Sequence, residues 1–135
     1  MPPQKGNKEI IFEKDGLKIS AENVKLSNGE VLEYKIYYND VITWQISGTA
    51  NGRTFKGGIS EMMGIHALEN RALYKLAGKA RDPILQDLER RGFKKITGVE
   101  RPKIAEFLER KARFTKEKHS EALGGFPVSK NLRRK

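Results

Sequence analysis

Two charged side chains with the spacing of a hydrolytic metal site lie in the first half of the chain. Glu33 and Lys35 are two positions apart in GEVLEYKIYY, so both point to the same face of an extended strand. In phosphodiester hydrolysis such a carboxylate holds Mg²⁺ and the lysine steadies the attacking water. The site also needs an upstream acidic residue, for which Glu22 is the nearest by spacing. The simpler interpretation is the charged outer face of an antiparallel strand, which we favour because Glu-x-Lys is a weak pattern.

A denser group of charged side chains is the segment LERRGFKKITGVERPK, residues 88–103. Gly92 and the phenylalanine after it fit a helix C-cap, and the two arginines before it complement the negative helix end. Lys94 and Lys95 lie beyond the reach of the helix dipole, so a cap does not account for them. Two interpretations stay open: a helix end alone, or a helix end that also contacts phosphate groups.

The positive charge is concentrated in the second part of the chain. The whole sequence has a net charge of +10. Residues 1–78 carry 10 Lys and Arg against 9 Asp and Glu, whereas residues 79–135 carry 17 against 8. This asymmetry indicates an anionic partner, and we rank nucleic acid before an anionic membrane or an acidic protein. The predicted nucleic-acid contacts are Arg90, Arg91, Phe93, Lys94, Lys95, Arg101, Lys103, Arg110, Lys111, Arg133, Arg134 and Lys135.

Other classes of chemistry have little support in the composition. The 135 residues contain no cysteine, which excludes disulfides, thiolate metal sites and cysteine nucleophiles. The same composition fits a cytoplasmic location. No apolar run approaches the ~20 residues of a membrane-spanning helix, so we expect no membrane partner. Apart from Glu69, three residues after His66, the two histidines have no acidic residue or second histidine at metal-site spacing on an evident shared face. We therefore expect no metal, no cofactor and no enzymatic activity.

The elements that must position these residues begin with a series of hairpins. Residues 9–59 alternate short apolar runs with turn signals, which predicts a five-stranded antiparallel meander. Asp15-Gly16 is a strong two-residue turn, and three further turns lie at residues 27–29, 38–40 and 51–52. We chose the registers that place apolar residues on one face. The predicted cross-strand pairs are Phe12–Ile19, Val24–Leu32, Ile36–Ile42, Tyr34–Trp44 and Trp44–Ile59.

Apolar residues recur at helical spacing in the second half. This pattern predicts helices over residues 60–78, 82–92 and 102–120, with Pro83 at the first position of the second helix. The chain is therefore predicted to be an α+β protein, in which the five-stranded antiparallel meander is followed by three helices and the first helix packs on the sheet. The predicted segments are a flexible lead (1–8), the sheet with the first helix (9–80), a basic helical part (81–123) and a flexible basic tail (124–135).

Residues 81–104, RDPILQDLERRGFKKITGVERPKI, also resemble the last part of a winged-helix domain. In that family a recognition helix leads into a basic hairpin, and Thr97-Gly98 would form the tip of the wing. The sequence departs from the family pattern because a sheet stands where the first helix belongs.

The leading interpretation is a small non-enzymatic protein that binds DNA or RNA through its basic helical part and tail. The outer face of the sheet is a second candidate surface for single strands, because an aromatic ring can stack on a base while lysines hold the backbone. The first alternative is an inhibitor or adaptor, for example from a mobile element, that docks on an acidic enzyme surface. The second alternative is the Mg²⁺-dependent nuclease. The candidate sheet-face contacts are Lys25, Lys35, Tyr37 and Lys56.

Overall fold

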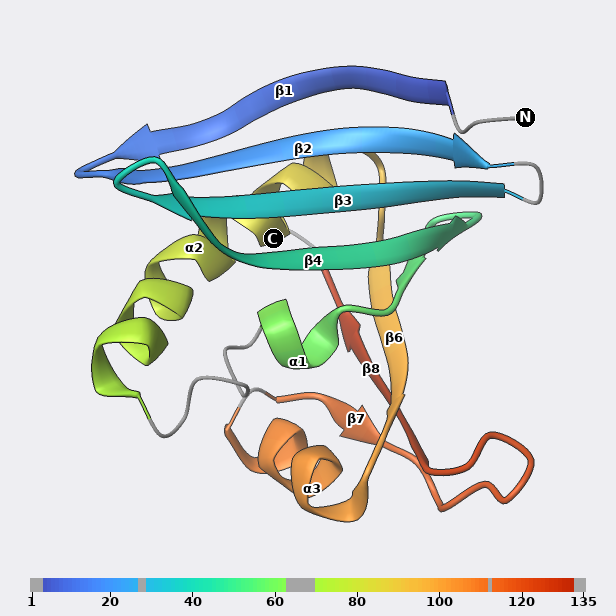
Figure 1. The fold of residues 1–135 in the computed structure, drawn as a ribbon. Coiled ribbons are helices and arrows are strands. Elements are labelled where there is room, and N and C mark those ends of the chain that lie inside the picture. Colours follow the sequence, from blue (N-terminus) through green and yellow to red (C-terminus); the bar gives the residue numbers. More distant parts are fainter. Residues whose placement is uncertain (1–3, 27–28, 63–69, 112, 133–135) are drawn as a thin grey trace.

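The computed structural model describes residues 4–26, 29–62, 70–111 and 113–132. This part of the chain forms one curved sheet with helices packed beside it (Figure 1). The strands are β1 (Gln4–Lys14), β2 (Leu17–Leu26), β3 (Gly29–Tyr38), β4 (Val41–Asn51), β5 (Thr54–Lys56), β6 (Lys95–Glu100), β7 (Thr115–Lys116) and β8 (Phe126–Asn131), and the helices are α1 (Ile59–Met62), α2 (Arg71–Arg90) and α3 (Pro102–Lys111).

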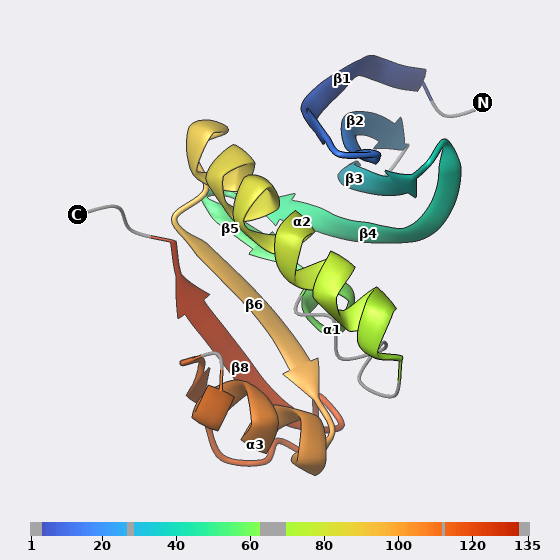
Figure 2. The same cartoon turned by 90° about the vertical axis from the view of Figure 1, so that its left-hand side faces the viewer.

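The sheet is larger than predicted and is mixed. Its strand order is β1-β2-β3-β4-β5-β6-β8-β7, with β5 and β6 parallel and every other neighbouring pair antiparallel. The prediction of a separate five-stranded antiparallel sheet was therefore wrong. A parallel pair needs a long crossover, and here residues 57–94 provide it with α1 and α2. Figure 2 shows that the sheet bends sharply between the meander and the β6–β8 part.

One helix replaces two of the predicted ones. α2 runs from Arg71 to Arg90 and contains Pro83, so the predicted break at Gly78 and the segment boundary at residue 80 both fall inside it. The buried residues Ala77, Ala80, Ile84 and Leu88 form one continuous stripe against the sheet. Burial of this stripe outweighs the roughly 3 kcal/mol that an internal proline costs. Of the predicted first helix, residues 63–69 lie outside the described part of the chain.

The segments after α2 also differ from the prediction. β6 passes straight through Thr97 and Gly98, so no wing tip forms there and the winged-helix interpretation was wrong. A Cβ atom at Gly98 would lie 2.8 Å from Cδ1 of Ile59, so a larger residue here would require the Ile59 side chain to shift. β8 pairs along the whole of β6, although its residues were assigned to the flexible tail. At the other terminus β1 begins within the predicted flexible lead.

The third helix is shorter than predicted. α3 ends at Lys111, and Arg113 adopts a left-handed conformation with φ of 59°. The amide of Phe114 then donates to the carbonyl of Leu108 at 3.0 Å, which brings the Phe114 side chain into the core. The chain continues into β7 and not as helix to residue 120, because burying Phe114 requires the reversal at Arg113.

The hairpin registers agree with the prediction at the first turn only. Phe12 lies opposite Ile19, as Asp15-Gly16 predicted. Tyr34 lies opposite Ile46 and not Trp44, and Val24 lies opposite Val31 and not Leu32. The register of β2 against β3 therefore differs from the prediction by one residue. This difference places Lys25 on the opposite face of the sheet from Lys35, so the proposed shared surface of these two lysines was wrong.

Candidate nucleic-acid interface

The C-terminal end of α2 has the hydrogen bonds of a glycine cap. Gly92 has a φ of +94°, its amide donates to Glu89 at 3.0 Å, and the amide of Phe93 donates to Leu88 at 3.0 Å. These two bonds satisfy carbonyls that the helix end leaves free. The Phe93 ring meets the buried Phe55 edge-on, with the ring centroids 5.8 Å apart. The cap predicted from Gly92 is therefore confirmed, and Phe93 has a structural contact.

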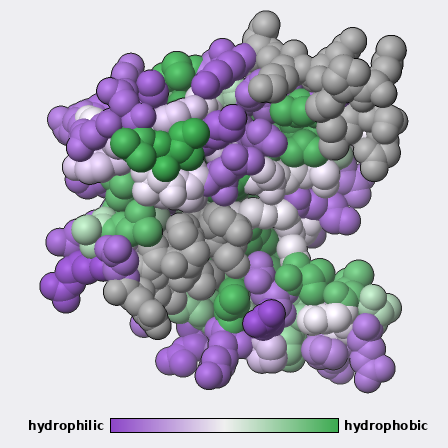
Figure 3. Space-filling model, in the orientation of Figure 1, coloured by the Kyte–Doolittle hydropathy of each residue, from purple (hydrophilic) through white to green (hydrophobic). Residues whose placement is uncertain are grey.

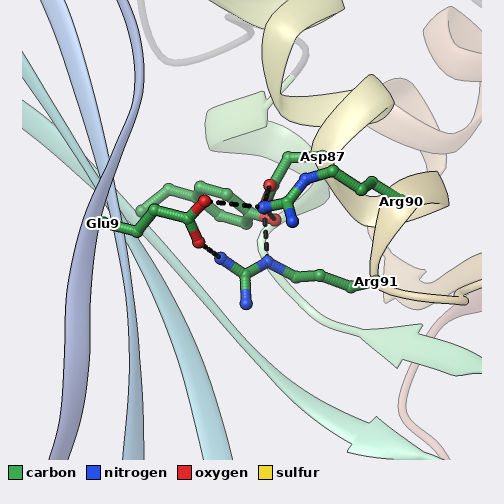
Figure 4. Close-up of polar contacts among 5 residues, drawn as sticks. Glu9, Asp87, Arg90 and Arg91 are labelled. Atoms are coloured by element: carbon green, nitrogen blue, oxygen red, sulfur yellow. Dashed lines mark hydrogen bonds and ion pairs between the residues drawn. The ribbon is translucent and has the colours of Figure 1, made fainter.

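Both arginines of RRGFKK take part in an ion-pair network that ties α2 to β1 (Figure 4). The Asp87 carboxylate accepts from Arg90 and from Arg91, each at 2.6 Å. Glu9 on β1 accepts from the same two arginines at 3.0 Å. The hydroxyl of Tyr34 on β3 donates to Asp87 at 2.7 Å. This network, which we call the Asp87 network (Glu9, Tyr34, Asp87, Arg90 and Arg91), joins the helix end to two strands.

Tyr34 gives the Asp87 network a predicted pH dependence. Burial, followed by the nearby Asp87 charge, raises the pKa of Tyr34 well above its usual value of 10.0. Above about pH 10 the unfolded chain therefore releases a proton that the folded protein keeps, and the free energy of unfolding falls by up to about 1.4 kcal/mol per pH unit. Urea unfolding from about pH 9 to 11.5 measures this slope, which Tyr34→Phe should reduce. If the free energy of unfolding fell equally steeply with pH in the unmodified protein and in Tyr34→Phe, Tyr34 would not be the source of the pH dependence.

The two lysines of RRGFKK are placed differently from the arginines. Lys94 and Lys95 are exposed at the start of β6, and neither forms an ion pair with any residue that the structure describes. The Lys94 amide donates to the carbonyl of Arg53 at 2.7 Å, and Lys95 lies opposite Thr54 on β5. The segment thus has two parts: a helix end held by the Asp87 network and a pair of solvent-exposed cations.

Two further cations lie on the adjacent strand segment. Arg53 and Lys56 are exposed, and Lys56 shares the open face of the sheet with Lys95 because the residues next to them, Phe55 and Ile96, are buried. From strand geometry, the Cα atoms of Lys56 and Lys95 are about 8 Å apart. We call this group the β5–β6 basic patch; its members are Arg53, Lys56, Lys94 and Lys95. The sequence prediction omitted Arg53, because only the parallel pairing of β5 with β6 brings it there.

A shallow hollow of about 420 Å³ adjoins the patch. Among the residues that the structure describes, Arg53, Arg91 and Lys94 line it together with a single acidic residue, Glu89, which gives an excess of two positive charges. Phe93 forms part of the wall. Phosphate groups are bound by such arrangements of arginine, lysine and backbone amides at a protein surface.

The predicted contacts on and next to α3 do not join this patch. Arg101 and Lys103 follow the far end of β6, roughly 20 Å from Lys95 along an extended strand. Arg110 pairs with Glu106 at 3.7 Å on exposed helix surface, and Lys111 is exposed beside it. The predicted contacts Arg133, Arg134 and Lys135 lie outside the described residues. The last described amide, that of Leu132, donates to Lys94 at 2.8 Å.

A second group of cations was missed by the sequence interpretation. Burial lowers the pKa of Lys130, and the charges of Arg81 and Arg113 lower it further. The ammonium group of Lys130 also lies over the ring of Phe114, 5.6 Å from its centroid. These cations come from α2, β8 and the segment after α3, so no local pattern could have grouped them. Lys130 lies opposite Ile96 and thus on the other face of the sheet from Lys95.

The ring of Tyr37 on the outer face of the sheet is already in contact with cations. Lys8 donates to the Tyr37 hydroxyl at 3.2 Å, and this hydrogen bond lowers the pKa of Tyr37. The ammonium groups of Lys8 and Lys18 lie 5.5 and 5.0 Å from its ring centroid. A base that stacks on Tyr37 would compete with these contacts, so this face is a weaker candidate than the β5–β6 basic patch.

The residues of the nuclease hypothesis do lie together. Glu22 is directly opposite Glu33, and Lys35 occupies the next position of β3 on the same face. Glu22 is only 8% exposed, and in register it faces Lys8. Mg²⁺ keeps several of its waters when it binds, and a carboxylate this buried offers a hydrated ion little access. Among the described residues, no group of three or more His, Cys, Asp or Glu is suited to hold a metal ion.

We therefore expect no Mg²⁺-dependent cleavage of DNA or RNA. The measurement is the release of fragments from end-labelled single and double strands, with Mg²⁺ or with EDTA. Lys35→Ala is the control, because it removes the residue that would steady the attacking water. Cleavage that requires Mg²⁺ and disappears in Lys35→Ala would establish the nuclease instead.

Comparisons with known proteins do not identify a function for this chain, so its function must be inferred from its own residues. A scan against protein-family models, a search of curated proteins and a search of solved structures each find no match. In the described part of the chain, no helix combines the length and apolar character needed to cross a membrane.

Proposed function

We propose that this protein binds nucleic acid through the β5–β6 basic patch. The observation that supports this most is that two adjacent segments, residues 53–56 and 94–95, carry four exposed cations, with Lys56 and Lys95 on the same face of the sheet. The neighbours of Lys56 and Lys95 in the ladder are uncharged residues that can also donate to phosphate oxygens. These neighbours are Thr49, Thr54, Thr97 and Asn131.

The proposed contacts are to the phosphate backbone. Lysine and arginine on an open sheet surface neutralise phosphates and position the protein, but they do not read base edges. The protein is accordingly proposed to bind without marked sequence preference and to act as a binding module in the cytoplasm. The Asp87 network supports the patch indirectly, because it fixes the helix end from which Lys94 and Lys95 follow.

Binding should weaken steeply as salt is raised. Four phosphate contacts predict a slope of log K against log salt of about −3.6 for duplex DNA and about −2.8 for single strands. Gel-shift or anisotropy titrations of single- and double-stranded DNA and RNA, from low salt upward, measure this slope. Binding that is undetectable at low salt, or that does not change with salt, would contradict the proposal and favour the protein-binding alternative.

A further inference from the structure

A groove of about 750 Å³ lies at the other end of α2 from the β5–β6 basic patch. The first half of α2 forms one wall, and the β1–β2 and β3–β4 turn regions form the other. Phe12, Leu17, Leu73 and Leu76 give it an apolar lining. Leu17 belongs to the core, and the other three are partly buried residues packed against the core. The groove is therefore an open edge of the hydrophobic core.

Apolar surface continues beyond the groove at the β3–β4 turn. Tyr38 lines the groove and is 44% exposed, and Val41, which lies opposite it on β4, is 65% exposed. Asn39 and Asp40 have φ of 50° and 68°, so a tight two-residue turn holds these side chains in place. Figure 3 shows hydrophobic surface at the end of the sheet where β3 and β4 are joined, bordered by hydrophilic side chains. A contiguous exposed apolar patch of this kind marks an interaction surface.

The charged groups around the groove are mainly lysines. Among the described residues, Lys14, Lys75 and Lys79 line it, and Asp15 is the one acidic residue of the lining. Lys75 and Lys79 are one helical turn apart and both are exposed, so they lie on the same side of α2. The lining therefore combines apolar side chains with an excess of two positive charges.

We infer that this groove binds an acidic amphipathic segment of a partner protein. Apolar side chains of the segment would pack on Phe12, Leu73 and Leu76, and its carboxylates would pair with the lysines. This is the pattern of an amphipathic helix in a groove, in which apolar anchors recur at helical spacing. A second copy of this chain is a poorer occupant, because each copy has a net charge of +10 and two lysine-lined faces repel one another.

The test uses a synthetic peptide probe and the full-length protein. The probe has about 16 residues, with leucines at i, i+3, i+4 and i+7 and glutamates between them. A second peptide has the same composition with the leucines scrambled. Fluorescence anisotropy should show at least roughly tenfold tighter binding of the patterned peptide, which corresponds to about 1.4 kcal/mol. Equal binding of the two peptides would overturn the inference, because only charge attraction would remain.

Matched variants locate the binding site. Lys75→Glu/Lys79→Glu should weaken peptide binding roughly tenfold, and Val41→Ser should weaken it severalfold without loss of core packing. Lys103→Glu/Lys111→Glu makes the same change of charge on α3 and should leave the affinity nearly unchanged. An equal loss in both double variants would overturn the inference. The inference would also be overturned if the protein formed a dimer and Lys75→Glu/Lys79→Glu dissociated it. The occupant of the groove would then be a second copy of this chain.

The same variants separate this groove from the proposed nucleic-acid surface. Lys94→Ala/Lys95→Ala should bind the peptide as the unmodified protein does, and Lys75→Glu/Lys79→Glu should lose much less nucleic-acid affinity than the Lys94/Lys95 variant. If the two double variants affect nucleic acid equally and the peptide not at all, the groove lysines belong to the nucleic-acid surface and the inference is wrong.

Discussion

Replacing Asp87 by alanine should lower the free energy of unfolding by about 3–5 kcal/mol. The Asp87 carboxylate is 3% exposed and accepts three hydrogen bonds, from Tyr34, Arg90 and Arg91. Its removal leaves the buried hydroxyl of Tyr34 without an acceptor and the largely buried Arg91 without its closest counter-charge. Chemical denaturation of the folded protein measures the loss.

Glu9→Ala is the matched control for Asp87→Ala. Glu9 pairs with the same two arginines, but its carboxylate is 48% exposed. Solvent-exposed ion pairs contribute only about 0–1 kcal/mol. Losses of similar size in the two variants would contradict the central position that we assign to Asp87. Asp87→Asn, which keeps one acceptor oxygen, should fall between them.

Lys94→Ala/Lys95→Ala should weaken nucleic-acid binding roughly 10- to 100-fold at low salt and lower the salt slope by about two units. Both side chains are exposed and lie outside the cap and the core, so the thermal midpoint should barely change. Lys103→Ala/Lys111→Ala removes the same charge from α3 and is the matched control. If both double variants weakened nucleic-acid binding equally, the phosphate contacts could not be assigned to the β5–β6 basic patch.

Phe93→Ala serves as a second control for the Lys94/Lys95 variant. Phe93 packs on Phe55 and closes the cap of α2. Its loss should destabilise the fold by roughly 1–4 kcal/mol, and the protein that remains folded should bind nucleic acid normally. A loss of binding at unchanged stability would instead indicate that the ring stacks on a base.

Local signals in the sequence correctly predicted the first hairpin and the end of α2. Asp15-Gly16 fixed the first hairpin, because both positions take positive φ there and Phe12 pairs with Ile19. Gly92 marked the end of α2 for the same conformational reason. At the β3–β4 turn the loop was predicted one residue too long. Asn39 and Asp40 both accept left-handed conformations, and a bulge after Ile36 keeps the apolar face continuous.

Contacts between distant segments could not be predicted in this way. The parallel pairing of Thr54–Lys56 with Lys95–Thr97 joins residues about 40 positions apart, and neither strand carries a pattern that names its partner. Without that pairing, Lys94 and Lys95 seemed to belong with the cations of α3. β8 was missed because glycine and proline suggested a flexible tail, although Val128 and Leu132 are buried at alternating positions of an extended segment.

The candidate site was predicted only in part, because some of its contacts also join segments that are distant in the sequence. Composition identified the basic half of the chain, and the cap pattern accounted for Gly92 and Phe93. The roles of Arg90 and Arg91 depend on Glu9, which precedes them by about 80 residues and gives no sign of this contact in the sequence. Arg53 lies in the nearly neutral first part and joins the patch only through the fold.

An NMR titration with a short oligonucleotide tests the central claim most directly. Backbone amide shifts are recorded as a random-sequence strand is added to the full-length protein at low salt. We predict that the largest shifts, all saturating with one affinity, fall on residues 53–56 and 94–97 and disappear together as salt is raised. Shifts confined to α3, to the face around Tyr37 or to the groove beside Lys75 and Lys79 would contradict the claim that the β5–β6 basic patch holds the nucleic acid.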